Sequence, residues 1–170
     1  MKKNQIIIMV SLIVIIAILV VAAFVIMPKL KKDDYSKITV TSKEMMDKIV
    51  TNLGEQMPKM MDVTKEDFTT IYGINLDKLD NYSAQMPMMN IRVNEVVIVK
   101  VKDIKDVEEV KSKLKTRSEA VAKTFETYLA DQYEIAKAPI ITSKGKYVLM
   151  TISEKKDDIE KIFNSYFEKK

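Results

Sequence analysis

An acidic residue opens a segment in which almost every other side chain is apolar. Glu95 lies in the run NEVVIVKVK at 94–102, which is short, β-branched and nearly free of polar residues, as is typical of a buried strand. Because side chains in a strand alternate between two faces, Glu95 shares its face with Val97 and Val99. An unpaired carboxylate on a buried face costs on the order of several kcal/mol. We therefore expect a basic partner for Glu95.

Arg117 is the predicted partner. A long helix is expected after Asp103, and its apolar stripe passes from Leu114 to Val121 without an apolar residue at position 117. Glu95 lies ~26 Å before Asp103 along a strand, and Arg117 lies ~21 Å after it along a helix. If the helix folds back along the strand, the two side chains meet. We predict an ion pair, which is either structural or a polar spot in a ligand pocket where Arg117 binds an anion.

Methionine is concentrated in one part of the chain. Eight of the 12 methionines lie between Met45 and Met89. Such flexible side chains fill cores, but they also form adaptable grooves for a partner peptide or helix, and Met86, Met88 and Met89 are the candidates for a groove. Thioether clusters can bind Cu(I), but soft-metal sites usually include Cys or His. The chain has neither, so we disfavour copper.

The absence of cysteine and histidine removes several kinds of chemistry. The usual zinc sites, Cys and Ser–His nucleophile systems and haem ligation are excluded. Carboxylates or a Ser/Lys pair remain available to a cell-envelope hydrolase, which is the alternative function. No such pair stands out, and Ser153 with Lys156 is better explained as a helix cap. We predict no catalytic, cofactor-binding or metal-binding residue and no cofactor.

The N-terminal part contains a candidate membrane span. Residues 6–27 are uncharged, and a helix of that length covers ~33 Å, enough for a bilayer core of about 30 Å. The run is too long for a cleavable signal peptide and ends without an A-x-A pattern. We predict a retained single-pass transmembrane helix, a basic cytoplasmic tail at 1–5 and a stalk at 28–40. Residues 41–170 then form an extracytoplasmic domain at the cell membrane.

The charge of this domain argues against one class of partner. Two of the chain's 28 basic residues precede position 29, which leaves 26 basic against 24 acidic residues, a formal charge of +2. A nucleic-acid-binding domain usually carries a marked excess of basic residues on one face. We therefore predict no nucleic-acid partner.

The domain is predicted to mix helices and strands. Capping residues and hydrophobic periodicity predict helices at 42–53, 65–72, 104–129 and 154–167, and strands at 82–86, 94–102, 139–143 and 146–152. The first strand is expected at the edge of the sheet, and the last two form a hairpin around Lys144 and Gly145. We expect an α+β fold, a two-layer sandwich of helices on a mainly antiparallel sheet.

Three stretches together resemble a known bacterial family. They are YGINLDKLDNYS, MPMMNIRVNEVVIVKVKDIKDVEEVKSKLKTRSEA and FETYLADQYEIAKAPIITSKGKYVLMTIS. In their order and spacing, over roughly residues 40–168, they are similar to domain of unknown function 4358, found behind export signals or membrane anchors. Many members begin with a lipoprotein-type signal and its Cys, which this chain lacks. The resemblance implies an exported or anchored domain and supplies no catalytic residue.

These observations lead to one expectation for function. We expect a single-pass, membrane-anchored extracytoplasmic domain of the cell envelope that acts as a binding module for an envelope protein, a peptide or another ligand. Its candidate polar site is Glu95 with Arg117, and its candidate partner groove is formed by Met86, Met88 and Met89.

Overall fold

A computed structural model of the chain describes residues 35 and 37–168. All of them belong to the compact unit Asp34–Lys170. No helix in this described part is both long and apolar enough to span a bilayer. The predicted cytoplasmic tail at 1–5, transmembrane helix at 6–27 and beginning of the stalk lie outside the described residues.

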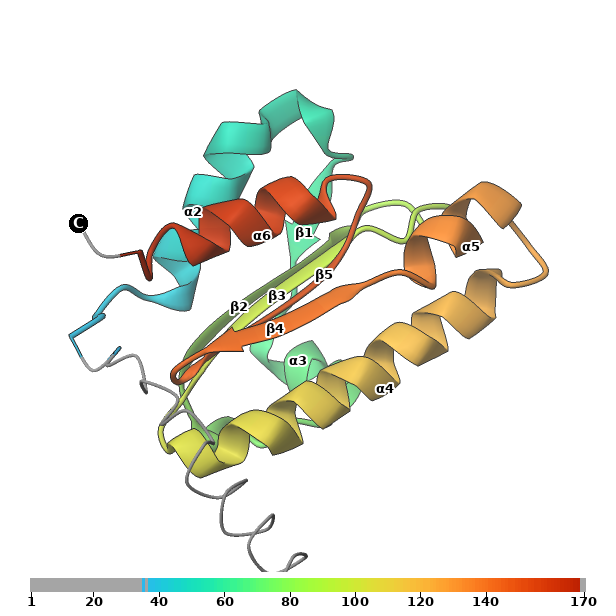
Figure 1. The fold of residues 1–170 in the computed structure, drawn as a ribbon. Coiled ribbons are helices and arrows are strands. Elements are labelled where there is room, and N and C mark those ends of the chain that lie inside the picture. The colour runs from blue at the N-terminus through green and yellow to red at the C-terminus, as the bar shows by residue number, and fades with distance from the viewer. Residues whose placement is uncertain (1–34, 36, 169–170) are drawn as a thin grey trace, which may run out of the picture. The chain divides into compact units, whose positions relative to one another are not determined.

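The centre of the described unit is one five-stranded antiparallel sheet (Figure 1). The strand order is β1-β2-β3-β5-β4, and each neighbouring pair is antiparallel. The strands are β1 (Met60–Asp62), β2 (Leu79–Pro87), β3 (Glu95–Val101), β4 (Ile140–Lys144) and β5 (Tyr147–Ile152). The predicted α+β class and antiparallel sheet are confirmed.

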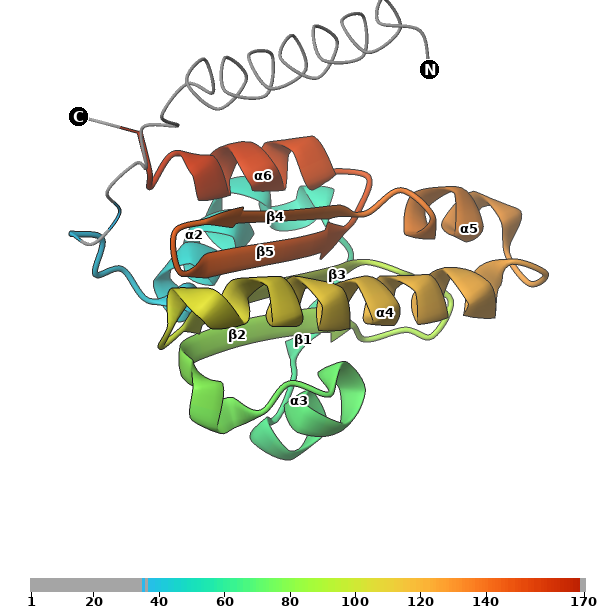
Figure 2. The same cartoon turned by 60° about the horizontal axis from the view of Figure 1, so that its bottom comes forward.

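Helices cover both faces of this sheet (Figures 1 and 2). One face packs against α2 (Ser42–Leu53) and α6 (Lys156–Asn164), and the other packs against α3 (Lys65–Tyr72) and α4 (Val107–Phe125). A fifth helix, α5 (Ala130–Ala136), follows α4 and packs beside it. Three short 3-10 turns lie at Gly54–Gln56, Leu76–Lys78 and Ile104–Asp106. The predicted two-layer sandwich is therefore wrong, because the unit has three layers.

Strand β3 is the physical reason for the third layer. Val97 and Val99 belong to the core under α3 and α4, whereas Val96 and Ile98 belong to the core under α2 and α6. All four are at most 1% exposed. A strand that is apolar on both faces can be buried only if both faces of the sheet are covered. The uninterrupted apolar run in 94–102 is the sequence feature that indicates a strand buried on both faces. A half-buried strand would instead alternate apolar and polar residues.

Several predicted helix ends are confirmed by their caps. The Thr41 side chain accepts a hydrogen bond from the Glu44 backbone N–H, and the Glu44 carboxylate accepts one from the Thr41 N–H at 2.7 Å. The Thr64 side chain caps α3 by accepting a hydrogen bond from the Asp67 backbone N–H, and Gly73 ends this helix in a left-handed conformation. Asp103 caps the 3-10 turn at Ile104–Asp106 instead of α4 itself.

Two strand predictions need correction. Strand β2 is longer than the predicted 82–86 and lies inside the sheet, because the unpredicted strand β1 pairs with its outer side. Strand β1 has only three residues, too few for a periodic pattern to reveal. The hairpin turn lies at Gly145 and Lys146, one residue later than predicted, since Lys144 pairs with Tyr147. Gly145 supplies the positive φ of 55° at this turn.

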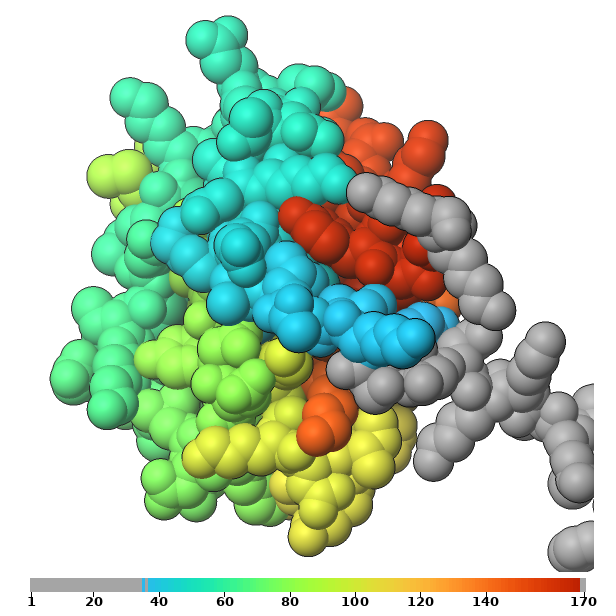
Figure 3. Space-filling view, turned by 90° about the vertical axis from the view of Figure 1, so that its left-hand side faces the viewer, coloured from blue at the N-terminus to red at the C-terminus, as the bar shows by residue number. Residues whose placement is uncertain are grey.

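The segment before α2 is joined to the sheet through one buried phenol. The Tyr147 hydroxyl lies 2.7 Å from the carbonyl oxygen of Val40, to which it donates, and its ring packs edge-on against Phe167. Helix α2 lies beside α6, as the neighbouring cyan and red surfaces in Figure 3 show. Partly buried side chains near both ends of the described part, Val40 and Phe167 among them, thus pack against the core under α2 and α6.

This closed packing predicts that the domain folds without the N-terminal segment. Residues 38–170 contain the strands and helices described above, and none needs a further segment to cover its apolar face. We expect the fragment 38–170 to show a single cooperative thermal transition that is insensitive to reducing agent, because the chain has no cysteine. Circular dichroism measures this transition. A disordered or persistently aggregated fragment would contradict the prediction.

Candidate functional site

The predicted ion pair between Glu95 and Arg117 is present. Arg117 Nη2 lies 2.7 Å from Glu95 Oε2, and Arg117 Nε lies 3.1 Å from Oε1 and 3.2 Å from Oε2. Glu95 is the first residue of β3, and Arg117 lies midway along α4, which crosses this face of the sheet. Two donors of the guanidinium therefore bind both carboxylate oxygens, the fork geometry that gives Arg–carboxylate pairs their strength and specificity.

The two partners are buried to different extents. The Glu95 side chain is 2% exposed, whereas the Arg117 side chain is 25% exposed. Burial lowers the pKa of the Arg117 guanidinium, but the hydrogen bonds and charge of Glu95 outweigh this effect and raise it above its usual value. Arg117 therefore stays charged, and its outer edge reaches solvent.

Tyr72 lies against this pair from α3. Burial raises the pKa of the Tyr72 phenol above its usual range, and the charge of Glu95 raises it further, so the phenol stays neutral. The hydroxyl lies near the carboxylate but makes no hydrogen bond of good geometry to any described residue. A buried hydroxyl in this situation loses its hydration without full compensation.

Replacing Tyr72 by phenylalanine is accordingly expected to leave stability unchanged or to raise it by up to about 1 kcal/mol, because no well-formed hydrogen bond is lost. The matched control is Tyr147→Phe, which removes the hydroxyl that donates to Val40 and should cost about 1 kcal/mol. Urea denaturation of both variants measures the difference. A larger loss for Tyr72→Phe than for the control would show that its hydroxyl is bonded in solution.

The ion pair forms part of the wall of a cleft with a volume of about 370 Å³. The remaining walls come from the end of β2, the turn that joins β2 to β3, and the second half of α4. Met86, Met88 and Met89 all line this cleft. The predicted polar site and the predicted methionine groove are thus one place in the structure.

Exposure separates Met88 and Met89 from the methionines of α2. Met88 and Met89 are 61% and 57% exposed, at the turn between β2 and β3. Met45 and Met46, by contrast, are at most 1% exposed and fill the core under α2 and α6. Core filling therefore explains the methionines of α2, whereas those beside the cleft leave large apolar side chains in solvent.

Arg92 is a cleft residue that the sequence analysis did not select. It lies on the same turn, is exposed, and has no carboxylate within 4 Å among residues 37–168. Hydrogen bonds from Gln132 chiefly lower the pKa of Asp131, and the charge of Arg92 adds to this effect. Composition is the sequence feature that could have identified Arg92, since Arg92 and Arg117 are the only arginines among the chain's 28 basic residues.

Buried amides hold this turn in place. The Val93 backbone N–H donates to Gln132 Oε1 at 3.2 Å, which joins the turn to α5. The Asn94 side-chain amide donates to the Glu154 carboxylate at 2.7 Å, which joins it to the segment before α6. Val93 and Asn94 are at most 2% exposed. The backbone beneath Arg92 is therefore fixed while its side chain remains in solvent.

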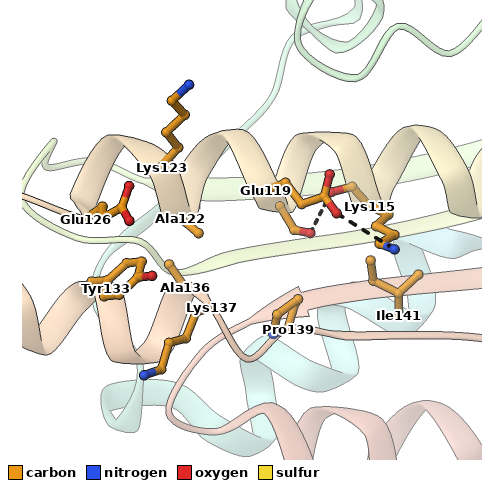
Figure 4. Close-up of a pocket in the computed structure, with 11 residues that line it drawn as sticks. Lys115, Glu119, Ala122, Lys123, Glu126, Tyr133, Ala136, Lys137, Pro139 and Ile141 are labelled. Atoms are coloured by element: carbon orange, nitrogen blue, oxygen red, sulfur yellow. Dashed lines mark hydrogen bonds and ion pairs between the residues drawn. The ribbon is translucent and has the colours of Figure 1, made fainter.

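A larger hollow of about 640 Å³ lies between α4, α5 and β4 (Figure 4). Its carboxylates are Glu119 and Glu126, which are exposed and lie on one wall, seven residues apart on α4. Glu119 pairs with Lys115 at 3.8 Å. Hydrolysis by two carboxylates needs them on either side of the scissile bond. This hollow does not have that arrangement.

Metal-binding groups were also sought in the part of the chain that the structure describes. No set of three or more Asp or Glu side chains there is arranged to hold an ion. The cleft itself contains one carboxylate, Glu95, whose two oxygens are bound by Arg117. The cleft is therefore suited to binding a charged group next to an apolar surface.

Comparison with known proteins identifies a family and no individual relative. Neither the curated proteins nor the solved structures include a match to this chain. One family profile, described as "domain of unknown function" and numbered 4358, matches residues 52–153, more than half of the chain. The matched region runs from the end of α2 to the end of β5 and includes every residue of the cleft. The chain belongs to the family of domain of unknown function 4358.

Proposed function

We propose that this chain is a membrane-anchored binding module, and that its domain recognises a peptide segment of a cell-envelope partner through the cleft lined by Met88, Met89 and Arg117. The observation that carries the proposal is the convergence of two features in one cleft of about 370 Å³. Exposed methionines offer an adaptable apolar surface, and a guanidinium with a solvent-facing edge offers a fixed polar contact. Ligand-binding clefts typically combine an apolar lining with a few placed polar groups.

The alternative of a cell-envelope hydrolase has less support. In the cleft, the single carboxylate is held by three hydrogen bonds from one guanidinium and is not available to reach a substrate. In the larger hollow, Glu119 and Glu126 project from one helix into solvent. A general acid or base needs a position within hydrogen-bond reach of the reacting group. The binding module is therefore the better-supported function.

The anchor and its orientation are part of the proposal. The apolar length of residues 6–27 supports a single membrane span, and the short basic tail before it favours a cytoplasmic N-terminus. Residues 41–170 then lie outside the cytoplasm. There the absence of cysteine leaves the domain without thiols to oxidise.

Protease accessibility tests this orientation. We expect protease added to intact cells stripped of their cell wall to digest the domain and leave a membrane-embedded N-terminal fragment. A cytoplasmic protein serves as the control and should be cut only after the membrane is permeabilised. Full protection of the domain in intact cells, or a mature N-terminus after Ala23, would contradict the proposed topology.

Site-specific photocrosslinking tests the binding site. A photoreactive amino acid at Met88 should capture one defined envelope partner, identified by mass spectrometry, when cells are irradiated. The control is the same amino acid at Ile104, which is 46% exposed and lies at the opposite end of α4. Equal capture of the same proteins from both positions, or capture from neither, would contradict a recognition role for the cleft.

A further inference from the structure

The ion pair occupies only part of the guanidinium of Arg117. Arg117 Nε and Nη2 bind the Glu95 carboxylate, whereas Nη1 has no hydrogen-bond partner among residues 37–168. A guanidinium carries five N–H donors in one plane. Because Glu95 fixes that plane, the two donors of Nη1 are held in a constant direction on a side chain that lines the cleft. A pre-oriented donor pair of this kind suits a carboxylate or another planar anion.

The charges of the lining favour an anion. Arg92 and Arg117 contribute two positive charges and Glu95 one negative charge, which gives the cleft a formal charge of +1. No lysine lines it, although lysine is the usual basic residue elsewhere in this chain. Arginine binds planar anions through directed hydrogen bonds, whereas lysine acts as a strongly hydrated point charge. A net charge of +1 in the lining matches a singly charged anion better than a phosphate monoester.

Apolar side chains form most of the rest of the lining, which also includes the polar residues Asn90 and Thr124. Val93, Val121 and Phe125 are each at most 7% exposed and pack together in one core cluster. All three border the cleft, as do the exposed Met88 and Met89. An apolar group seated here would remove water from the methionine side chains as well as from itself, and each buried CH₂ contributes about 0.8 kcal/mol.

We propose that the cleft recognises a carboxylate attached to an apolar group, with Arg117 Nη1 and Arg92 as its charged contacts. This inference rests on the proposed binding function and adds the chemical class of the ligand. The carboxylate faces the two arginines, and the apolar group lies against Val121, Phe125 and the methionines. The C-terminus of a peptide and a small free carboxylic acid both present this chemistry.

Two pairs of probes distinguish the chemistry and its source. The first pair is acetyl-alanyl-leucine and its C-terminal amide, and the second is 4-methylpentanoate and its amide. The full chain is placed in lipid nanodiscs with ¹³C-labelled methionine methyl groups, and the signals of Met88 and Met89 report binding. Met57, which is partly buried against the core under α2 and α6 and lies outside the cleft, is the internal control.

We expect the acid of at least one pair to shift the Met88 and Met89 signals and its amide to bind about ten- to hundredfold more weakly, the range for a charge-assisted hydrogen bond. Binding of the peptide acid alone identifies a peptide C-terminus, and equal binding of 4-methylpentanoate identifies a free acid. Equal binding of acid and amide would overturn the carboxylate inference and leave the binding function standing. If no probe shifts these signals, the inference fails, and capture from Met88 still decides the proposed function separately.

Substitution of Arg92 tests the proposed contact between its guanidinium and the carboxylate of the ligand, without disturbing the core. Arg92→Gln removes an exposed charge and should weaken binding of the acid about two- to fivefold while leaving the amide unchanged. Lys123→Gln, which removes an exposed charge from α4 outside the cleft, is the matched control and should change neither. An equal loss for acid and amide in Arg92→Gln, or an equal loss in both variants, would overturn the assignment of Arg92 as a charged contact.

Discussion

Replacing Arg117 by methionine is expected to destabilise the domain by about 3 kcal/mol, near the lower end of the range for breaking a buried ion pair. The variant leaves the carboxylate of Glu95, which is 2% exposed, without its guanidinium partner. The lower end applies because the Arg117 side chain is itself 25% exposed and keeps part of its hydration in the native protein. Urea denaturation of the fragment 38–170 measures the loss.

The double variant Glu95→Leu/Arg117→Met is the matched control. It removes both charges and fills their place with apolar side chains, a change that is often neutral or stabilising for a buried pair. We expect it to recover most of the stability lost in Arg117→Met, because no buried charge remains. A double variant less stable than the single one would contradict this explanation, because removing the unpaired carboxylate of Glu95 would then not restore stability. A single variant within about 0.5 kcal/mol of the natural protein would show that Glu95 is not buried in solution.

Alanine substitutions on the two sides of the sheet are expected to be comparably destabilising. Leu114 of α4 and Ile159 of α6 are both 0% exposed, and each belongs to the core on its own side. Truncating either one leaves a cavity, which costs about 2–5 kcal/mol for a buried Leu or Ile. Thermal or urea denaturation of Leu114→Ala and Ile159→Ala measures both effects.

This comparison tests the three-layer arrangement directly. Ile104→Ala is the control, because Ile104 is 46% exposed and its truncation should change stability by no more than about 0.5 kcal/mol. If either Leu114→Ala or Ile159→Ala behaved like this control, the sheet would be covered on one face only. That outcome would support the two-layer arrangement that the sequence alone predicted.

Most of the elements were predictable because they follow local rules. The capping box at Thr41, the cap at Thr64 and the stop at Gly73 depend on residues within one turn of each helix end. The ion pair between Glu95 and Arg117 was also predictable, although the two residues are far apart in sequence. Each interrupts an apolar pattern, and the strand and helix lengths place them at similar depth.

The third layer and the complete cleft were harder to predict. Helices α2 and α6 have one apolar face each, and that pattern does not state which side of a sheet the helix will cover. Arg92 lies at the cleft because the neighbouring Val93 and Asn94 make buried hydrogen bonds to segments that are distant in sequence. Such contacts depend on tertiary packing, so no local sequence pattern predicts them.

The most direct test of the cleft as a recognition site is the yield of photocrosslinking from Met88 after charge reversal beside it. We expect Arg92→Glu to reduce the yield of the captured partner at least about fivefold, because it reverses the charge at the rim of the cleft. Lys65→Glu makes the same change of charge at an exposed position in the first turn of α3, outside the cleft, and should leave the yield unchanged. Equal yields from the natural chain and from Arg92→Glu would contradict recognition of a partner through this cleft.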